Sequence, residues 1–138
     1  MQFLKHLAMT GAIAFSALSC AAEPGVSDNA ITIGMSAPLS GPNGAYGLDM
    51  RQTIQNYFGQ VNKAGGIFGR KLELVALDDG YETERTVNNT KQLITEKNAF
   101  ALHAFYGSSP TTEAMNTVFG PAKVPLVGTI SAGPVWGR

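Results

Sequence analysis

Apolar residues follow two different spacings along this chain, and the two spacings alternate. Four short segments are continuously or alternately apolar, as β-strands are: 31–37, 71–77, 99–106 and 124–128. Between them, apolar side chains recur every three or four positions, which is typical of helices that bury one face. These expected helices run from Leu48 to the glycines at 65–66, over 83–97, and over 111–119. The order β-α-β-α-β-α-β predicts an α/β fold, a parallel sheet with helices on both faces.

The third apolar segment contains a single polar interruption, His103. Its neighbours at 101, 102, 104 and 105 are all apolar, which predicts a strand buried on both faces of the sheet. We therefore interpret His103 as a hydrogen-bonded core residue in preference to a catalytic one.

The ends of the expected strands show where a ligand would bind. In a parallel α/β sheet the ligand crevice lies beyond the carboxyl ends of the strands. This rule selects four segments: 38–47, 78–82, 107–112 and 129–133.

The segment 107–112 reads Gly-Ser-Ser-Pro-Thr-Thr and leads from a strand into a helix, with Pro110 expected at the first helical position. Free backbone N–H groups and the positive end of the helix dipole favour an anion, such as a carboxylate, at such a place. Serine is also a common helix cap. From these residues alone, capping by Ser109 is the favoured interpretation.

The segment 38–47 is glycine-rich, but it does not match a phosphate-binding loop. Its glycines at 41, 44 and 47 fit neither G-x-G-x-x-G nor G-x-x-x-x-G-K-[ST], and no lysine follows them. Tyr46 is the more informative residue, because an aromatic ring with a hydroxyl tip can face a small ligand. Packing of Tyr46 on its own loop is an equal alternative.

Asp78 and Asp79 end the second strand, where paired carboxylates could act as acid and base or bind a cation. Capping of the following turn is the favoured role, since no further ligand follows at a metal-binding spacing. There is no G-x-S-x-G nucleophile motif, and Cys20 is the only cysteine. The sequence therefore indicates no catalysis, no metal and no cofactor.

The N-terminus has the pattern of a signal peptide. Lys5 precedes an uncharged apolar stretch at 7–18 and a run of small residues at 19–22. Lipidation at Cys20 is a less favoured alternative, because Ala17 stands where such signals usually have leucine. Removal of residues 1–22 would leave a cysteine-free chain of 116 residues, whose polar start at 23–30 we expect to be a flexible leader.

The ten basic and ten acidic residues cancel, and no block of five or more like charges occurs. This balance excludes the basic surface of a nucleic-acid-binding protein.

Four blocks of the sequence resemble the leucine/isoleucine/valine-binding family of type I periplasmic solute-binding proteins. They are IGMSAPLSGPNGAYGLDM at 33–50, VNKAGGIFGRKLELVALDD at 61–79, YGSSPTTEA at 106–114 and VPLVGTISAG at 124–133. The resemblance implies two α/β lobes joined by a hinge, which close around an amino acid or a related carboxylate or amide. It also implies a periplasmic, non-enzymatic component of an importer of the ABC class, with a permease in the inner membrane as partner.

The resemblance also assigns site residues. Tyr46 matches an aromatic residue at the cleft, and Ser108 or Ser109 matches the serine that binds the ligand carboxylate. The loop after the fourth strand supplies Thr129 and Ser131, of which Ser131 is the better hydroxyl candidate. These assignments reverse the preference for a capping role at 108–109.

The sequence departs from the family pattern in two respects. A disulfide present in some members would fall on Tyr81 and Gly107, so both cysteines are absent together. Family members also continue into a second lobe, which supplies the group for the ligand ammonium. We therefore expect 31–138 to form an N-terminal lobe that stops before the second one.

Two other classes of protein remain open at this stage. An exported ligand-sensing module would pass its signal to a membrane receptor, and neighbouring permease and ATPase genes would argue against it. An exported α/β enzyme would need a nucleophile or a metal cluster that the sequence does not show.

Overall fold

The computed structural model describes residues 23–133. The expected signal peptide with Cys20, and the last five residues, lie outside the described range.

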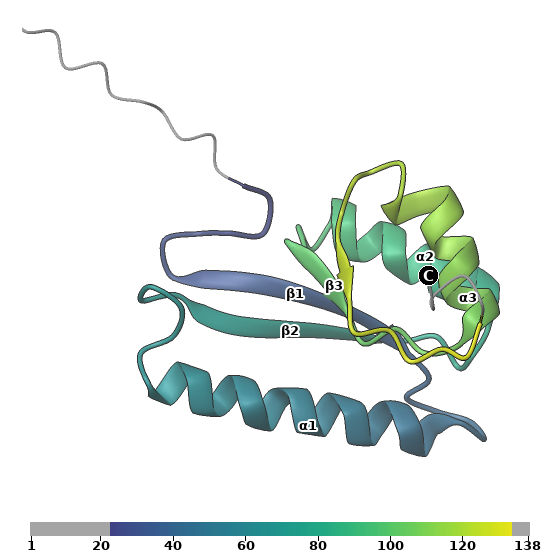
Figure 1. Cartoon of the computed structure of the whole chain (residues 1–138), viewed down its shortest axis with the longest axis horizontal. Coiled ribbons are helices and arrows are strands. Elements are labelled where there is room, and N and C mark those ends of the chain that lie inside the picture. Colours follow the sequence, from purple (N-terminus) through teal and green to yellow (C-terminus); the bar gives the residue numbers. More distant parts are fainter. Residues whose placement is uncertain (1–22, 134–138) are drawn as a thin grey trace, which may run out of the picture.

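Strands and helices alternate along the chain, as the spacing of apolar residues predicts (Figure 1). The strands are β1 Ala30–Ala37, β2 Lys71–Asp78, β3 Ala101–His103 and β4 Leu126–Val127. The helices are α1 Gly44–Lys63, α2 Thr83–Thr95 and α3 Ser108–Ala114, and α3 continues into a π-helical turn at Met115–Phe119. All pairs in the sheet are parallel, in the order β2-β1-β3-β4. The predicted α/β class is confirmed.

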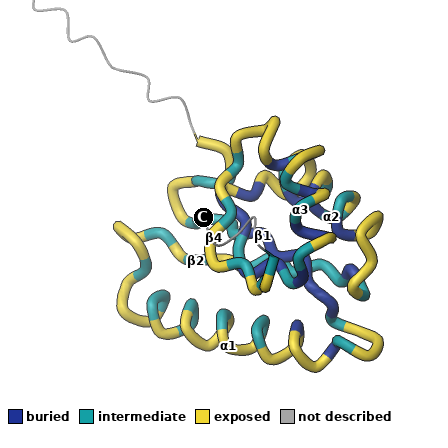
Figure 2. Tube along the Cα trace, turned by 45° about the vertical axis from the view of Figure 1, so that its right-hand side comes forward, coloured by how far each residue is buried: buried dark blue, intermediate teal, exposed yellow. Residues whose placement is uncertain are grey.

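The two faces of the sheet are covered unequally. Helices α2 and α3 pack together on one face, over a core that includes Leu93, Leu102 and Phe105 (Figure 2). Helix α1 packs on the other face, where the buried cluster is smaller and is centred on Met35. Helix α1 lies mainly over β1 and β2, so the same face of β3 and β4 is less fully covered within residues 23–133 (Figure 1).

The two edges of the sheet differ in how they are protected. On the outer strand β2, Lys71 and Glu73 are exposed and alternate with partly buried apolar residues. Charged side chains on an edge strand disfavour pairing with another chain. The opposite edge strand, β4, is only two residues long and exposes Val127.

Three boundaries differ from those that the sequence predicts. Helix α1 starts at Gly44, four residues earlier than Leu48. Strand β3 is much shorter than 99–106, because Ala104 has a positive φ of 56° and breaks the extended backbone. Strand β4 is likewise shorter than 124–128.

The start of α3 also corrects the sequence interpretation. The helix begins at Ser108, so Pro110 is its third residue and not its first. The N-cap is Gly107, with a positive φ of 97°, and no side chain among residues 23–133 caps this helix by a hydrogen bond. Ser109 is therefore not the cap.

The segment 23–30, expected to be a flexible leader, forms a hydrogen-bonded turn. The backbone N–H of Thr32 donates to the carbonyl oxygen of Gly25 at 2.8 Å, and Val26 forms a bridge with Ile31. Ala30 already belongs to β1.

Candidate functional site

The carboxyl ends of the strands bring Ser108 and Ser131 together. Ser108 follows β3 and Ser131 follows β4, and their hydroxyl oxygens lie 2.8 Å apart. The N–H of Gly133 donates to the Ser131 hydroxyl at 3.2 Å. Two of the hydroxyl candidates of the sequence, Ser108 and Ser131, therefore meet in one place, although they are 23 residues apart in the chain.

The other two hydroxyl candidates do not join this pair. Ser109 is exposed. The Thr129 hydroxyl donates to the carbonyl oxygen of Phe105 at 3.1 Å. Thr129 thus helps to hold the loop after β4 against the end of β3, together with the bond from the Ile130 N–H to the same carbonyl at 2.9 Å.

Tyr46 is part of a row of three tyrosines at this edge of the sheet. Its ring stacks on Tyr106, with centroids 5.6 Å apart and an angle of 17° between the planes. The ring of Tyr81 packs edge-on against Tyr106, with centroids 5.6 Å apart and an angle of 62° between the planes. Tyr46 is 58% exposed and Tyr81 is 43% exposed. The ring of Tyr46 therefore both packs and presents surface to solvent.

Sequence reasoning did not select Tyr81 or Tyr106 as site residues. The available signal was their position, because Tyr106 ends the third apolar segment and Tyr81 lies in the segment 78–82. The positions that the family resemblance assigns to a disulfide are adjacent in space. A Cβ atom added to Gly107 would lie 2.5 Å from Cε2 of Tyr81.

Asp78 holds two of the loops in place. Its carboxylate accepts hydrogen bonds from the Leu39 N–H at 2.8 Å and the Ser40 hydroxyl at 2.6 Å, which lie in the loop after β1. It also accepts from the Gly80 N–H and forms an ion pair with Arg85 at 3.1 Å. Burial by itself would raise the pKa of Asp78, but these donors outweigh it and lower the pKa to about 2. The carboxylate is a structural anchor that stays ionised.

Asp79 is fully buried and plays a similar local role. It accepts a hydrogen bond from the Ser36 hydroxyl at 2.8 Å and another from the Tyr81 N–H at 2.9 Å. Burial raises its pKa, and these two bonds oppose the rise only in part. Within residues 23–133, no three His, Cys, Asp or Glu side chains are placed to hold a metal ion. The hydrogen bonds that the two carboxylates accept from neighbouring segments are those of the structural role that the sequence favours.

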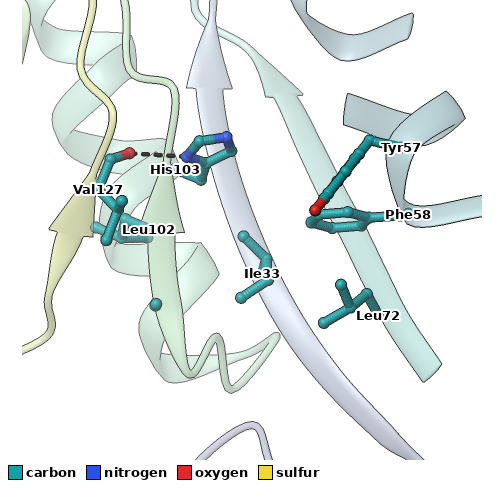
Figure 3. A pocket seen from close by; sticks show the side chains of 8 residues that line it. Ile33, Tyr57, Phe58, Leu72, Leu102, His103 and Val127 are labelled. Carbon is teal, nitrogen blue, oxygen red and sulfur yellow. Dashed lines mark hydrogen bonds between the residues drawn. The ribbon is translucent and has the colours of Figure 1, made fainter. Parts of the chain in front are cut away.

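His103 lies at an open groove and is not enclosed in the core. Its Nδ1 is 2.8 Å from the carbonyl oxygen of Val127, and the ring is only half-buried. Figure 3 shows this groove between α1 and the strands. Its volume is about 330 Å³, and it is lined by Ile33, Tyr57, Phe58, Leu72, Ala101, Leu102, His103 and Val127. The prediction of a strand buried on both faces holds for Ala101 and Leu102, which are buried, but not for His103, which is only partly buried.

This groove leads to a prediction about self-association. Tyr57 is 62% exposed and Val127 is 59% exposed, so the groove presents apolar surface beside the short edge strand β4. Contiguous apolar surface of this kind promotes association. We expect residues 23–138, expressed alone, to self-associate, and Val127→Lys to shift the population toward monomer in sedimentation velocity.

Phe68 provides the control for this prediction. It is 95% exposed in the turn between α1 and β2, away from the groove. Phe68→Lys should leave self-association unchanged. A monodisperse monomer with a sharp cooperative melt for the unmodified chain would contradict the expectation.

The fold described above agrees with comparisons to known proteins. The family model "Periplasmic binding protein" matches residues 30–137. The chain belongs to the periplasmic binding protein family. Within that family it is similar to the Leu/Ile/Val-binding proteins, as the four sequence blocks predict.

Two curated relatives illustrate the similarity. The Leu/Ile/Val-binding protein homolog 3 of Brucella melitensis is 35% identical over 89 residues, which cover 64% of this chain and 24% of that protein. An amino acid binding protein of Pseudomonas aeruginosa is 29% identical over 121 residues, which cover 86% of this chain and 32% of that protein. The chain therefore spans less than a third of the length of these relatives.

Solved structures show the same partial coverage. A possible leucine/isoleucine/valine-binding protein from Rhodopirellula baltica superposes with a TM-score of 0.68 at 29% identity, over 78% of this chain and 28% of that one. The branched-chain amino acid transporter substrate binding protein of Streptococcus pneumoniae, solved with isoleucine, superposes with a TM-score of 0.70 at 29% identity. The match covers 80% of this chain and 32% of that one. A search of residues 23–133 for membrane-spanning helices finds none of sufficient length and apolarity.

Proposed function

We propose that this periplasmic binding protein chain is part of the extracytoplasmic solute-binding component of an ABC importer. Its ligand would be a small amino acid or a related carboxylate or amide, and it would not act as an enzyme. The observation that carries the proposal is the Ser108–Ser131 hydroxyl pair, 2.8 Å apart at the carboxyl ends of two neighbouring strands. Ligands of open α/β sheets bind at this edge.

The pair is suited to a carboxylate. At present the two hydroxyls bond to each other, so one of them accepts. A ligand carboxylate carries two acceptor oxygens, and both hydroxyls could then donate to it. No side chain in the described part of the chain caps the first turn of α3 by a hydrogen bond. Tyr46, 58% exposed, would supply apolar contact to the rest of the ligand.

The remaining parts of the proposal follow from the family. We propose that 31–138 is the N-terminal lobe, that a second lobe completes the cleft, and that residues 1–22 direct export to the periplasm. The matches cover only 24% and 32% of the length of the two relatives. This partial coverage supports a cleft to which residues outside this chain also contribute. The inner-membrane permease would be the protein partner.

Calorimetric titration tests the proposal. The protein is the product of the longest open reading frame that contains this chain, expressed without residues 1–22. The panel is L-leucine, L-valine, L-phenylalanine, L-glutamine, 4-hydroxybenzoate and acetamide. We expect micromolar binding of at least one member. Absence of binding across the whole panel would contradict the proposal.

Substitutions in the serine pair test which hydroxyls bind. Ser108→Ala and Ser131→Ala should each weaken binding of the preferred acid by roughly tenfold to a hundredfold, since a hydrogen bond to a charged group contributes about 1.5–3 kcal/mol. Titration calorimetry measures both. Ser109→Ala is the matched control, because Ser109 is exposed and outside the pair. The affinity of this variant for the acid should change less than twofold. A large effect at Ser109 alone would contradict the assignment.

A further inference from the structure

Tyr81 is held in an unusual backbone conformation by the two aspartates before it. Its φ is +68°, which is rare for an aromatic residue, and Gly80 before it is also left-handed at +57°. The Gly80 N–H donates to Asp78 and the Tyr81 N–H donates to Asp79, both at 2.9 Å. A strained residue persists only where its surroundings determine it, and such residues gather at functional sites. The question is what this conformation achieves.

It places the tyrosine ring against the residue that precedes Ser108. A Cβ atom added to Gly107 would lie 2.5 Å from Cε2 of Tyr81 and 3.2 Å from both Cζ and the hydroxyl oxygen. The ring therefore occupies the space that any side chain at 107 would need. Gly107 is itself left-handed, and its N–H donates to the Ile130 carbonyl oxygen at 2.9 Å. The backbone at 107 is thus fixed on one side by the loop after β4 and on the other by the Tyr81 ring.

The same ring supports the aromatic row. Tyr81 meets Tyr106 edge-on, and Tyr106 stacks on Tyr46. Edge-to-face and stacked pairs at 5.6 Å are within the favourable range for aromatic rings. Tyr81 therefore contacts the two residues immediately before Ser108, one through its side chain and the other through its backbone.

We propose that Tyr81 is a positioning residue for the Ser108 hydroxyl. By filling the space at Gly107 and supporting Tyr106, its ring fixes the direction in which the Ser108 hydroxyl points toward a ligand carboxylate. This inference rests on the proposed function, because it presumes that Ser108 binds a carboxylate.

The first test changes Gly107, in the longest product described above. Gly107→Ala introduces a methyl group where the ring lies, and it should displace Ser108. Affinity for the best-binding acid among L-leucine, L-valine, L-phenylalanine and 4-hydroxybenzoate should fall at least tenfold. Affinity for the primary amide of the same acid should fall by a clearly smaller factor, because a hydrogen bond to a neutral amide oxygen contributes less than one to a charged carboxylate. A general loss of fold would weaken both ligands equally.

Gly65→Ala is the matched control for this variant. Gly65 has a similar positive φ of 108°, but no atom of the described chain comes within 4 Å of its added Cβ. It therefore also places an alanine at a positive φ, but without the contact to a ring. Affinity for both the acid and the amide should stay within twofold of the unmodified protein.

The second test changes Tyr81 and applies even if Gly107→Ala does not fold. Tyr81→Phe keeps the ring and should leave the acid-to-amide affinity ratio within twofold. Tyr81→Leu removes the ring and should lower that ratio at least fivefold. If Tyr81→Leu weakens the acid and the amide equally, or changes neither, the positioning role is wrong. If the unmodified protein binds no member of the panel, it is the proposed function that fails.

Discussion

Replacing Gly47 with alanine is expected to destabilise the protein by about 3 kcal/mol or more. The added Cβ would lie 1.9 Å from the carbonyl oxygen of Pro38 and 2.7 Å from its carbonyl carbon. Both are backbone atoms, so the first turn of α1 would have to move away from the loop after β1. Urea unfolding, followed by circular dichroism, measures the change as a lower midpoint.

Gly59 in the same helix is the control for this prediction. No atom of the described chain comes within 4 Å of a Cβ built there. Gly59→Ala should therefore raise stability by about 0.5–1 kcal/mol, through helix propensity alone. Equal midpoints for the two variants would contradict the close approach of α1 to Pro38.

The second large effect is expected at Asp78. Its pKa is about 2 in the folded protein, against an ordinary value of 3.8. A carboxyl group with a lowered pKa stabilises the fold where it is ionised in both states, above about pH 4. That contribution is lost as the pH falls from about 4 to about 2. The difference corresponds to about 2 kcal/mol.

Asp78→Asn tests this prediction. At neutral pH the variant should be less stable by about 2 kcal/mol, and the gap to the unmodified protein should narrow steadily below pH 4. Urea unfolding at a series of pH values measures it. Asp79, whose pKa is raised, titrates in the opposite sense; the charge of Asp78 is the smallest cause of that rise, so most of the contribution of Asp79 is common to both proteins. Glu113→Gln, at an exposed carboxyl, is the control and should change stability by less than about 0.5 kcal/mol. A gap that does not depend on pH would contradict the anchoring role.

The order and type of the elements could be predicted from the sequence because apolar spacing reports which face of each element is buried. The boundaries could not. Gly44 and Gly47 resemble loop residues in sequence, yet they form the first turn of α1, where Gly47 lets the helix approach the backbone of Pro38. That requirement comes from a tertiary contact, which local pattern does not contain. The partial exposure of His103 likewise could not be predicted, since it depends on how far α1 extends over the sheet.

The site was partly predictable for a similar reason. Ser108 and Ser131 came from matching motifs, and their contact follows once β3 and β4 are neighbours. Tyr81 could not be selected, because its role depends on a left-handed backbone at 80–81 and on the missing side chain at Gly107. The glycines at 80 and 107 are visible in the sequence, but the contact between Tyr81 and Gly107 is a tertiary one that local pattern does not contain.

The shortness of β4 has a consequence for the order in which the site forms and opens. Ser108 stands beside the central strand pair, whereas Ser131 depends on a two-residue edge strand, the last of the four to be synthesised. Local fraying of β4 would separate the hydroxyls while the rest of the sheet stays paired. A ligand that forms hydrogen bonds to both serines would stabilise the pairing of β4 with β3. Occupancy of the site and protection of the β4 amides from hydrogen exchange should then rise together.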